Sequence, residues 1–287
     1  MHENKIKSYL SLVKFSHTIF ALPFAFIGFF LATQKYNFEF KWSLLGLVVL
    51  CMIFARNAAM GFNRLIDREI DLKNTRTANR EIPSGKIQIA SARLFIIVNA
   101  IFFVASTYFI NPLCFYLSPI ALLIILGYSF TKKITVLCHF ILGLGLSLAP
   151  IGAFIAVTGE FKLLPMLFSI VVLFWVSGFD IIYALQDESF DKVENLKSIP
   201  VLFGKKRALL LSRLLHLIVV LFIGLIGLFD LGNFYWLGAF IFSILLMYQH
   251  TIVKVNDLSK LNLAFFTANG IASVIFGIFV ILGLLVR

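Results

Sequence analysis

The sequence predicts an all-α polytopic membrane protein, with nine transmembrane helices in a single domain over residues 1–287. Of these residues 60% are hydrophobic and only 14% are charged, whereas soluble domains carry about 25% charged residues. Apolar runs of about 20 residues, enough to cross a hydrocarbon core of roughly 30 Å, recur along the whole chain. Lysine and arginine are concentrated in alternate connections between these runs, which is typical of proteins with several membrane spans.

The first five spans are separated by polar residues and helix breakers. The first is longer than a signal-peptide core and has no Ala-x-Ala-like cleavage site, so we expect it to be retained. The second runs into an acidic segment that begins at Asn63. Asn111-Pro112 separates the third from the fourth, and Thr158-Gly159-Glu160 closes the fifth, because such residues interrupt helices. We place these spans at residues 15–33, 43–62, 91–109, 112–129 and 135–157.

The last four spans include one that also runs into an acidic segment. This is the sixth, in which Asp180 already lies within the apolar run. Leu231-Gly232-Asn233 separates the seventh from the eighth. Two connections, 63–90 and 186–207, are long, polar and rich in both charge signs, and long loops in compact proteins are often functional. We place these spans at residues 164–185, 208–229, 232–250 and 262–285.

The positions of the cations predict the orientation, because loops rich in Lys and Arg stay in the cytoplasm. With the N-terminus inside, the inner segments hold nearly all of the 25 Lys and Arg residues, and the outer segments hold only Lys35, Lys41, Lys162 and Arg287. An odd number of spans then puts the C-terminus outside. We expect an integral protein of a bacterial inner membrane, with both long loops cytoplasmic. Topology and contact with anionic lipid explain the net charge of +11, so no nucleic-acid partner is expected.

The cysteine and histidine residues predict neither a disulfide framework nor a histidine-rich metal centre. The three cysteines fall in or beside apolar segments. None of the five histidines has another histidine at i+3 or i+4, the spacing that a helical metal site uses. His17 and His139 are expected to be packed or interfacial residues, with the lining of an internal cavity as the alternative.

The first acidic segment contains Asn63, Asp67 and Asp71, at positions i, i+4 and i+8. On a helix these positions drift only about 80° around the axis, so their side chains share one face. Magnesium ions in proteins are held by one or two carboxylates, by water and by phosphate oxygens of the substrate. The spacing therefore predicts a Mg²⁺ site at a membrane boundary.

The second acidic segment contains Asp180, Asp187 and Asp191, at positions i, i+7 and i+11. On a continuous helix these three lie within about 40° of one another, and Tyr183 shares their side. An ionisable residue within an apolar run, such as Asp180, is costly and marks a functional site by default.

Either segment alone could be a solvated helix end with local ion pairs, such as Asp67 with Arg64 or Asp187 with Lys192. Two segments of the same form on the same side of the membrane favour a shared diphosphate instead. Divalent ions held by opposed carboxylates would neutralise a diphosphate and make it a leaving group. The sequence has no Walker-type glycine loop, so a nucleoside triphosphate is not favoured. Loop cations available to complete the diphosphate site are Lys73, Arg76, Arg80 and Lys132.

The motifs of this chain resemble those of the UbiA superfamily of intramembrane prenyltransferases. Residues 63–85 match the pattern N-x-x-x-D-x-x-x-D followed by R-T-A-x-R-x-(I/L)-P-S-G, and residues 180–191 match D-x-x-Y-A-x-x-D-x-x-x-D. Residues 17–24, 128–133 and 148–153 are similar to other family segments. Arg64 stands where some members have Asp.

The resemblance implies a bundle of nine helices around a central cavity, with a polar cap over its cytoplasmic mouth. Within the superfamily, the chain resembles most the 4-hydroxybenzoate polyprenyltransferase type. In that type the aromatic acceptor attacks an allylic cation through its ring carbon ortho to the hydroxyl group. The implied Mg²⁺ ligands are Asn63, Asp67, Asp71, Asp187 and Asp191, with Asp180 as a further candidate. The implied contacts of the diphosphate or the cation are Arg76, Lys132, Lys73, Tyr128 and Tyr183. Lys14 is a candidate to bind the acceptor carboxylate, or a lysine that only sets the topology.

The substrates implied by this resemblance are a polyprenyl diphosphate and an aromatic acceptor such as 4-hydroxybenzoate, in quinone biosynthesis. A bicyclic acid of menaquinone biosynthesis, or haem, would use the same metal chemistry. A cation-coupled secondary transporter is an alternative from another class, but transporter sites usually lie near the bilayer midplane on broken helices. A lipid-binding scaffold would not require two matched acidic segments. No obligate protein partner is expected.

Overall fold

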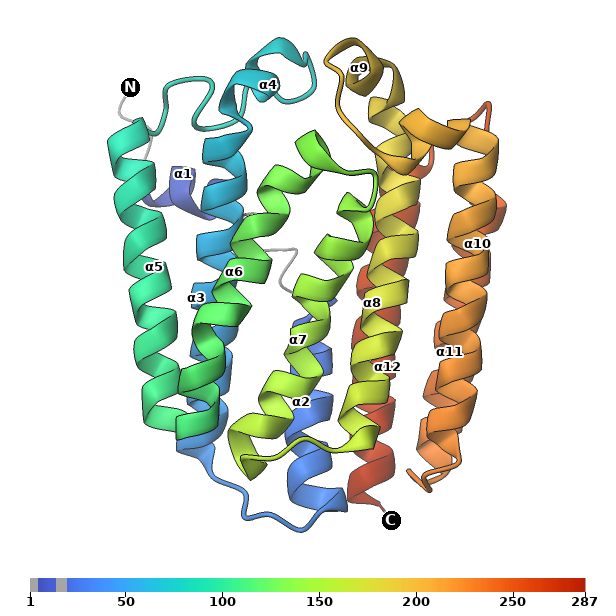
Figure 1. The fold of residues 1–287 in the computed structure, drawn as a ribbon. Helices are drawn as coiled ribbons and strands as arrows, with labels where there is room; N and C mark the ends of the chain where they lie inside the picture. The colour runs from blue at the N-terminus through green and yellow to red at the C-terminus, as the bar shows by residue number, and fades with distance from the viewer. Residues whose placement is uncertain (1–4, 14–19, 287) are drawn as a thin grey trace.

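The computed structural model describes residues 5–13 and 20–286, and almost all regular structure in that part of the chain is helical (Figure 1). Eight of the described helices are long and apolar enough to cross a membrane, and α2 (Leu22–Phe30) with η2 (Leu31–Lys35) forms a shorter apolar helix. The prediction of nine apolar spans is thus confirmed over the described residues, although residues 15–19 of the first lie outside them. The long helices are α3 (Trp42–Ile66), α5 (Ile89–Ile110), α6 (Pro112–Ile134), α7 (Cys138–Thr158), α8 (Leu163–Ala184), α10 (Ile199–Gly227), α11 (Asn233–Ile252), and α12 (Asn269–Leu285) with η4 (Leu263–Ala268) before it.

The largest difference from the predicted spans is the start of α10, which begins at Ile199 rather than at residue 208. The Ser198 side chain accepts a hydrogen bond from the backbone N–H of Val201 and so caps the helix. Gly204 then adopts φ +75°, which kinks the chain before the membrane-spanning part. The cations that follow Gly204 are typical of a loop, and for that reason the sequence did not reveal the earlier start.

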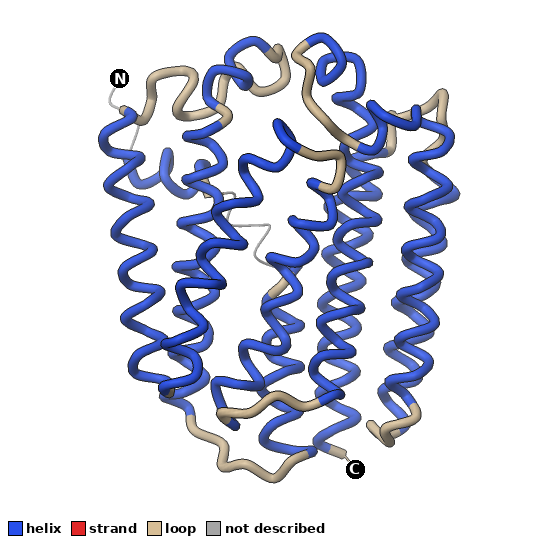
Figure 2. Tube along the Cα trace, viewed as in Figure 1, coloured by secondary structure: helices blue, strands red, loops and turns tan. Residues whose placement is uncertain are grey.

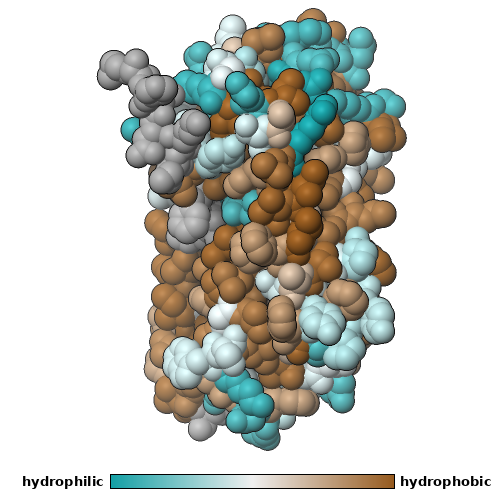
Figure 3. All heavy atoms as spheres, turned by 90° about the vertical axis from the view of Figure 1, so that its left-hand side faces the viewer, coloured by the Kyte–Doolittle hydropathy of each residue, from teal (hydrophilic) through white to brown (hydrophobic). Residues whose placement is uncertain are grey.

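The surface that faces lipid is an apolar belt. On α5, which lies at one edge of the bundle, Leu94, Ile97 and Ile101 expose more than half of their side chains. Figure 3 shows this side of the molecule as a broad hydrophobic band between hydrophilic residues at its two ends, with most of these residues at one end. Because burial of such a band in water-free lipid is favourable, the molecule is an integral membrane protein.

The interior of the bundle is packed with aromatic side chains, and small residues allow the helices to approach closely. Trp175, Tyr235 and Phe276 are completely buried where α8, α11 and α12 meet. A Cβ atom on Gly28 of α2 would lie 2.0 Å from the carbonyl oxygen of Pro150 on α7. Only glycine fits at this crossing, which is typical of membrane helices packed through small residues.

The two acidic segments lie at the same end of the bundle. They form the short helices α4 (Arg68–Lys73) and α9 (Glu188–Val193), which neighbour each other at the end where the described chain begins (Figure 1). The last helix, α12, ends at the opposite end of the bundle, and the connections around α4 and α9 project beyond the long helices (Figure 2). The described chain therefore begins and ends toward opposite ends of the bundle, as an odd number of spans requires, and the cytoplasmic location of the acidic end stays a prediction.

Candidate functional site

The first acidic segment keeps its helical spacing although the helix is interrupted. α3 ends at Ile66 and α4 begins at Arg68, but the N–H of Asp67 still bonds to the carbonyl of Asn63 (3.0 Å) and that of Asp71 to the carbonyl of Asp67 (2.7 Å). The Asn63 amide donates to Asp67 Oδ2 at 3.0 Å. Asn63 and Asp67 therefore meet as their spacing predicts.

The Asp71 carboxylate is buried, with 6% of the residue exposed. Arg80 NH1 donates to its Oδ1 at 2.5 Å, because the loop after α4 folds back over it. Its Oδ2 accepts no hydrogen bond from the described residues, and Arg64 NH1 lies 4.0 Å from it. Arg64 thus pairs with Asp71 and not with Asp67, so the first of the local ion pairs considered from sequence is absent.

The second acidic segment does not continue as one α-helix. α8 ends at Ala184 and a 3₁₀ turn, η3 (Leu185–Asp187), precedes α9. A 3₁₀ turn rotates by about 120° per residue instead of about 100°, so the single helical face expected for Asp180, Asp187 and Asp191 is interrupted. Asp180 Oδ2 instead accepts a hydrogen bond from His139 Nδ1 at 2.7 Å. His139 is 2% exposed and packed, as expected.

Cations of the first loop bind acids of the second segment. Arg76 donates to both carboxylate oxygens of Asp187, from Nε at 3.2 Å and from NH2 at 2.7 Å, and its NH1 donates to the Tyr183 hydroxyl at 3.4 Å. Lys73 Nζ lies 2.6 Å from Glu194 Oε2, just after α9. These contacts tie two segments together that are more than 100 residues apart in sequence. Asp187 therefore does not pair with Lys192, which binds Glu188 instead.

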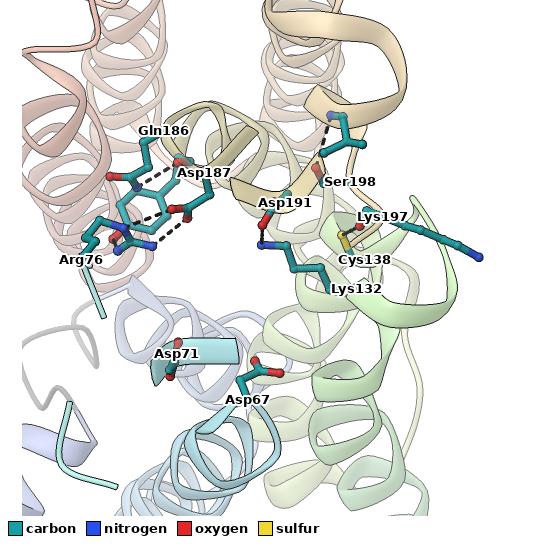
Figure 4. Close-up of polar contacts among 12 residues, drawn as sticks. Asp67, Asp71, Arg76, Lys132, Cys138, Gln186, Asp187, Asp191, Lys197 and Ser198 are labelled. Atoms are coloured by element: carbon teal, nitrogen blue, oxygen red, sulfur yellow. Dashed lines mark hydrogen bonds and ion pairs between the residues drawn. The ribbon is translucent and has the colours of Figure 1, made fainter. Parts of the chain in front are cut away.

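Two adjacent lysines at the end of α6 reach one acid from each segment. Lys132 Nζ lies 2.8 Å from Asp191 Oδ1, and Lys133 Nζ lies 3.8 Å from Asp67 Oδ1. Figure 4 shows Asp67 and Asp71 on one side and Asp187 and Asp191 on the other, with Arg76 and Lys132 reaching toward the second pair. The carboxylates of both segments therefore converge on one region.

The Asp67 carboxyl group has an unusual pKa. Burial is the main cause that raises this pKa to about 6; the nearby Asp71 acts in the same direction, whereas Lys133 and Lys132 oppose the shift. The side chain still exposes 26% of its surface. Asp67 is therefore ionised at neutral pH and gains a proton in mildly acidic solution.

The oxygen-bearing side chains of this site suit a hard cation, but they are not arranged around one point as metal ligands. In the described ranges, no three His, Cys, Asp or Glu side chains lie close enough together to hold a metal ion. The carboxylates are paired one by one with Lys and Arg, because acids converging in one place repel each other unless cations neutralise them. Asp71 Oδ2 and Asp191 Oδ2 are buried and accept no hydrogen bond from the described residues. An all-oxygen set with free acceptors suits Mg²⁺, which takes its other ligands from phosphate and water.

The remaining predicted residues are placed as follows. Tyr128 lies one turn before Lys132 on α6, and Tyr183 lies between Asp180 and the 3₁₀ turn. Lys14 and His17 lie outside the described residues. The carboxylates of the two acidic segments lie toward one end of the bundle, which does not favour a transporter site near the midplane.

Two residues were missed as site candidates from sequence. Glu194 binds Lys73 across the two loops, and nothing in its local pattern distinguished it. Arg56 lies two turns before Asn63 on α3, so it shares that face about 10 Å deeper in the bundle. An arginine inside an apolar span is itself a functional signal, although as a single cation it also fits the charge pattern that predicts the topology.

Comparison with known proteins identifies the family of this chain. Residues 21–271 match the UbiA prenyltransferase family. Similar curated proteins include the 4-hydroxybenzoate octaprenyltransferases of Aliivibrio fischeri strain MJ11, 29% identical over 235 residues, and of Aliivibrio salmonicida, 30% identical over 237 residues, each match covering 82% of both chains.

Solved structures share the fold. The apo structure of a UbiA homolog from Aeropyrum pernix K1 matches with a TM-score of 0.80 and 28% identity, over 94% of this chain and 97% of that one. A UbiA homolog from Archaeoglobus fulgidus bound to GPP and Mg²⁺ matches with a TM-score of 0.71 and 23% identity, over 96% and 99% of the two chains. With the family match over most of its length, the chain belongs to the UbiA prenyltransferase family and is a membrane-embedded prenyltransferase.

Proposed function

We propose that this protein transfers a polyprenyl group from a prenyl diphosphate to an aromatic acceptor such as 4-hydroxybenzoate, with Mg²⁺ as cofactor. The observation that carries this proposal is the convergence of Asp67 and Asp191, from distant segments, on the adjacent lysines 133 and 132. The names of the Aliivibrio relatives, and the GPP and Mg²⁺ bound to the Archaeoglobus homolog, support the same reaction.

The proposed ligands of the metal ions are Asn63, Asp67, Asp71, Asp187 and Asp191. Bound Mg²⁺ would neutralise the diphosphate and so make it a better leaving group. The free oxygens of Asp71 and Asp191 support this assignment. Because ions would neutralise the carboxylates, the cations that pair with these acids would become available to the phosphate oxygens.

The proposed diphosphate contacts are Arg76 and Lys132, with Lys73 and Arg80 beside them. Arg76 already uses two of its nitrogens on one carboxylate, and the same fork fits a phosphate. The N-terminus and both acidic segments would face the cytoplasm, where lysine and arginine loops are retained. The isoprenoid tail would lie among the apolar helices, which offer it a hydrocarbon-like environment.

The direct test of this function is an assay with purified protein, Mg²⁺, a long-chain prenyl diphosphate and a panel of acceptors. The panel contains 4-hydroxybenzoate, a bicyclic hydroxynaphthoic acid and haem. We expect release of diphosphate and a C-prenylated aromatic acid. Turnover with haem alone, or no prenylated product from any acceptor, would contradict the proposal. A product from the bicyclic acid alone would identify that acid as the acceptor in place of 4-hydroxybenzoate.

Arg56 is our candidate for binding the acceptor carboxylate, since it lies below Asn63 on the same face of α3. The Arg56→Gln variant is expected to raise KM for 4-hydroxybenzoate by about 30-fold, because it loses a charge-assisted hydrogen bond. The KM for prenyl diphosphate should change little. Initial rates with 4-hydroxybenzoate and its uncharged methyl ester check this, and an equal loss for both acceptors would remove Arg56 from the role.

The raised pKa of Asp67, about 6 without metal, predicts a pH dependence of Mg²⁺ binding. The ion binds the carboxylate form, so binding is complete above this pKa and is lost as the pH falls through it. We expect the apparent Mg²⁺ affinity to fall about fivefold from pH 6 to pH 5. Thermal stabilisation by Mg²⁺ with a prenyl thiodiphosphate measures this affinity, and Asp67→Asn should flatten the profile. An affinity unchanged over that interval refutes the assignment.

A further inference from the structure

The last membrane helix begins with a π-helical segment, η4 (Leu263–Ala268), next to the diphosphate site. Its two phenylalanines both contact Tyr183. The Phe265 ring stacks on the Tyr183 ring with centroids 4.0 Å apart, and the Phe266 ring meets it edge-on at 5.9 Å. Wide π turns inside helices are frequently found at functional sites.

Tyr183 connects this segment to the acidic site. Arg76 NH1 donates to its hydroxyl at 3.4 Å while the same guanidinium binds Asp187. The Arg76 guanidinium carbon also lies 5.8 Å from the centre of the Tyr183 ring. Tyr183 therefore has its hydroxyl at the acidic cluster and one ring face against Phe265.

The buried side chain of Asn269 holds the wide turn in place. Its amide nitrogen donates to the carbonyl oxygens of Ala264 (2.9 Å) and Phe265 (3.2 Å). Its amide oxygen accepts a hydrogen bond from Trp175 Nε1 at 2.9 Å, and its nitrogen lies 3.2 Å from Gln249 Oε1. Asn269 is 1% exposed, so three helices fix it, and an apolar residue there would leave buried polar groups unsatisfied.

We propose that Asn269 and Phe265 are positioning residues that hold Tyr183 in place. Tyr183 then forms an aromatic wall that keeps water from the allylic cation formed at the diphosphate site. This inference rests on the proposed function. Phe179 extends the wall, because its ring meets that of Phe265 at 5.2 Å. Aromatic faces attract a cation without reacting with it as water does.

The allylic cation can react with the acceptor or with water. The proportion of these two products shows whether the aromatic wall excludes water or is only a packing contact. When the C1–O bond breaks, its electron pair leaves with the diphosphate. Attack by the ortho carbon of the acceptor forms a C–C bond, and the ring then loses a proton. Attack by water forms a C–O bond and releases a proton, which gives a prenyl alcohol. The ratio of C-prenylated product to alcohol therefore reports how well water is excluded.

The test compares Phe265→Leu with Phe276→Leu, using whichever acceptor the panel identifies. Phe276 is on the same helix and completely buried, but its ring packs against Phe242 at 4.9 Å rather than against Tyr183. We expect Phe265→Leu to lower the product-to-alcohol ratio about tenfold, with KM for prenyl diphosphate nearly unchanged. Phe265→Tyr should restore the ratio. Phe276→Leu should lower the melting temperature and leave the ratio as in the wild type.

Asn269→Ala provides a second test, in which the Phe265 and Tyr183 side chains are retained and only the residue that positions them is changed. It should shift the ratio in the same direction as Phe265→Leu, and it decides the question should Phe265→Leu not fold. A wild-type ratio in Phe265→Leu and Asn269→Ala, or an equal change in Phe276→Leu, overturns the inference. If the wild type transfers no prenyl group to any acceptor, the proposed function fails; if it does and the ratio does not move, only this inference fails.

Discussion

The Asp191→Asn variant is expected to lose about 10³-fold in kcat, since each metal ion stabilises the departing diphosphate by several kcal/mol. Asp191 is 0% exposed, its Oδ1 is bound only by Lys132 at 2.8 Å, and its Oδ2 accepts no hydrogen bond in the described structure. Asparagine keeps the volume and one oxygen but removes the charge. The loss should therefore appear in turnover and in the Mg²⁺ concentration required, not in the amount of folded protein.

A matched control for this variant is Asp257→Asn, at the same end of the bundle. The Asp257 side chain is exposed and bonds only locally, to Ser259 at 2.6 Å. Single-turnover rates over a range of Mg²⁺ concentrations should be those of the wild type for Asp257→Asn. If Asp191→Asn and Asp257→Asn behave alike, Asp191 has no role in metal binding.

The Arg76→Ala variant is expected to lower kcat/KM for prenyl diphosphate by about 100-fold or more, because two charge-assisted hydrogen bonds to one group are removed together. Arg76 is the cation that joins the first loop to Asp187 and Tyr183. Arg76→Lys should recover only a small part of the loss, since an ammonium group cannot reproduce the two-point contact of a guanidinium.

Steady-state kinetics with varied prenyl diphosphate measure this loss, with Arg93→Ala as the control for charge alone. Arg93 is an exposed arginine near the same end of the bundle, on α5. Removal of one positive charge from that surface should change kcat/KM less than threefold at moderate salt, because exposed charges are screened. Full activity of Arg76→Lys would show that a point charge is sufficient and that the forked geometry is irrelevant.

The fold could be predicted well from the sequence because membrane spans depend on local composition. Runs of apolar residues and breakers such as Asn111 determine the helices one at a time; Asn111 indeed caps α6, accepting from the N–H of Cys114 at 2.8 Å. The start of α10 was missed because a charged turn and a helical turn have similar compositions. The π-helix at Leu263–Ala268 was also missed, since it depends on tertiary contacts of Asn269.

The candidate site could be predicted as a set of residues but not as a set of contacts. Spacing brought Asn63 and Asp67 together, and their hydrogen bond follows directly from helix geometry. Which cation binds which acid depends instead on the path of the loops. Local pairing suggested Lys192 for Asp187, whereas the folded loop delivers Arg76 from the other segment.

The most direct test of the shared diphosphate site is the binding of Mn²⁺, in place of Mg²⁺, to protein saturated with a prenyl thiodiphosphate. Electron paramagnetic resonance can count the ions and detect coupling to phosphorus. The convergence of the two acidic segments predicts two ions per chain, both coupled to phosphorus, with one ion lost in Asp67→Asn and one in Asp191→Asn. Ions that show no coupling to phosphorus, or an ion count unchanged by both substitutions, would contradict it.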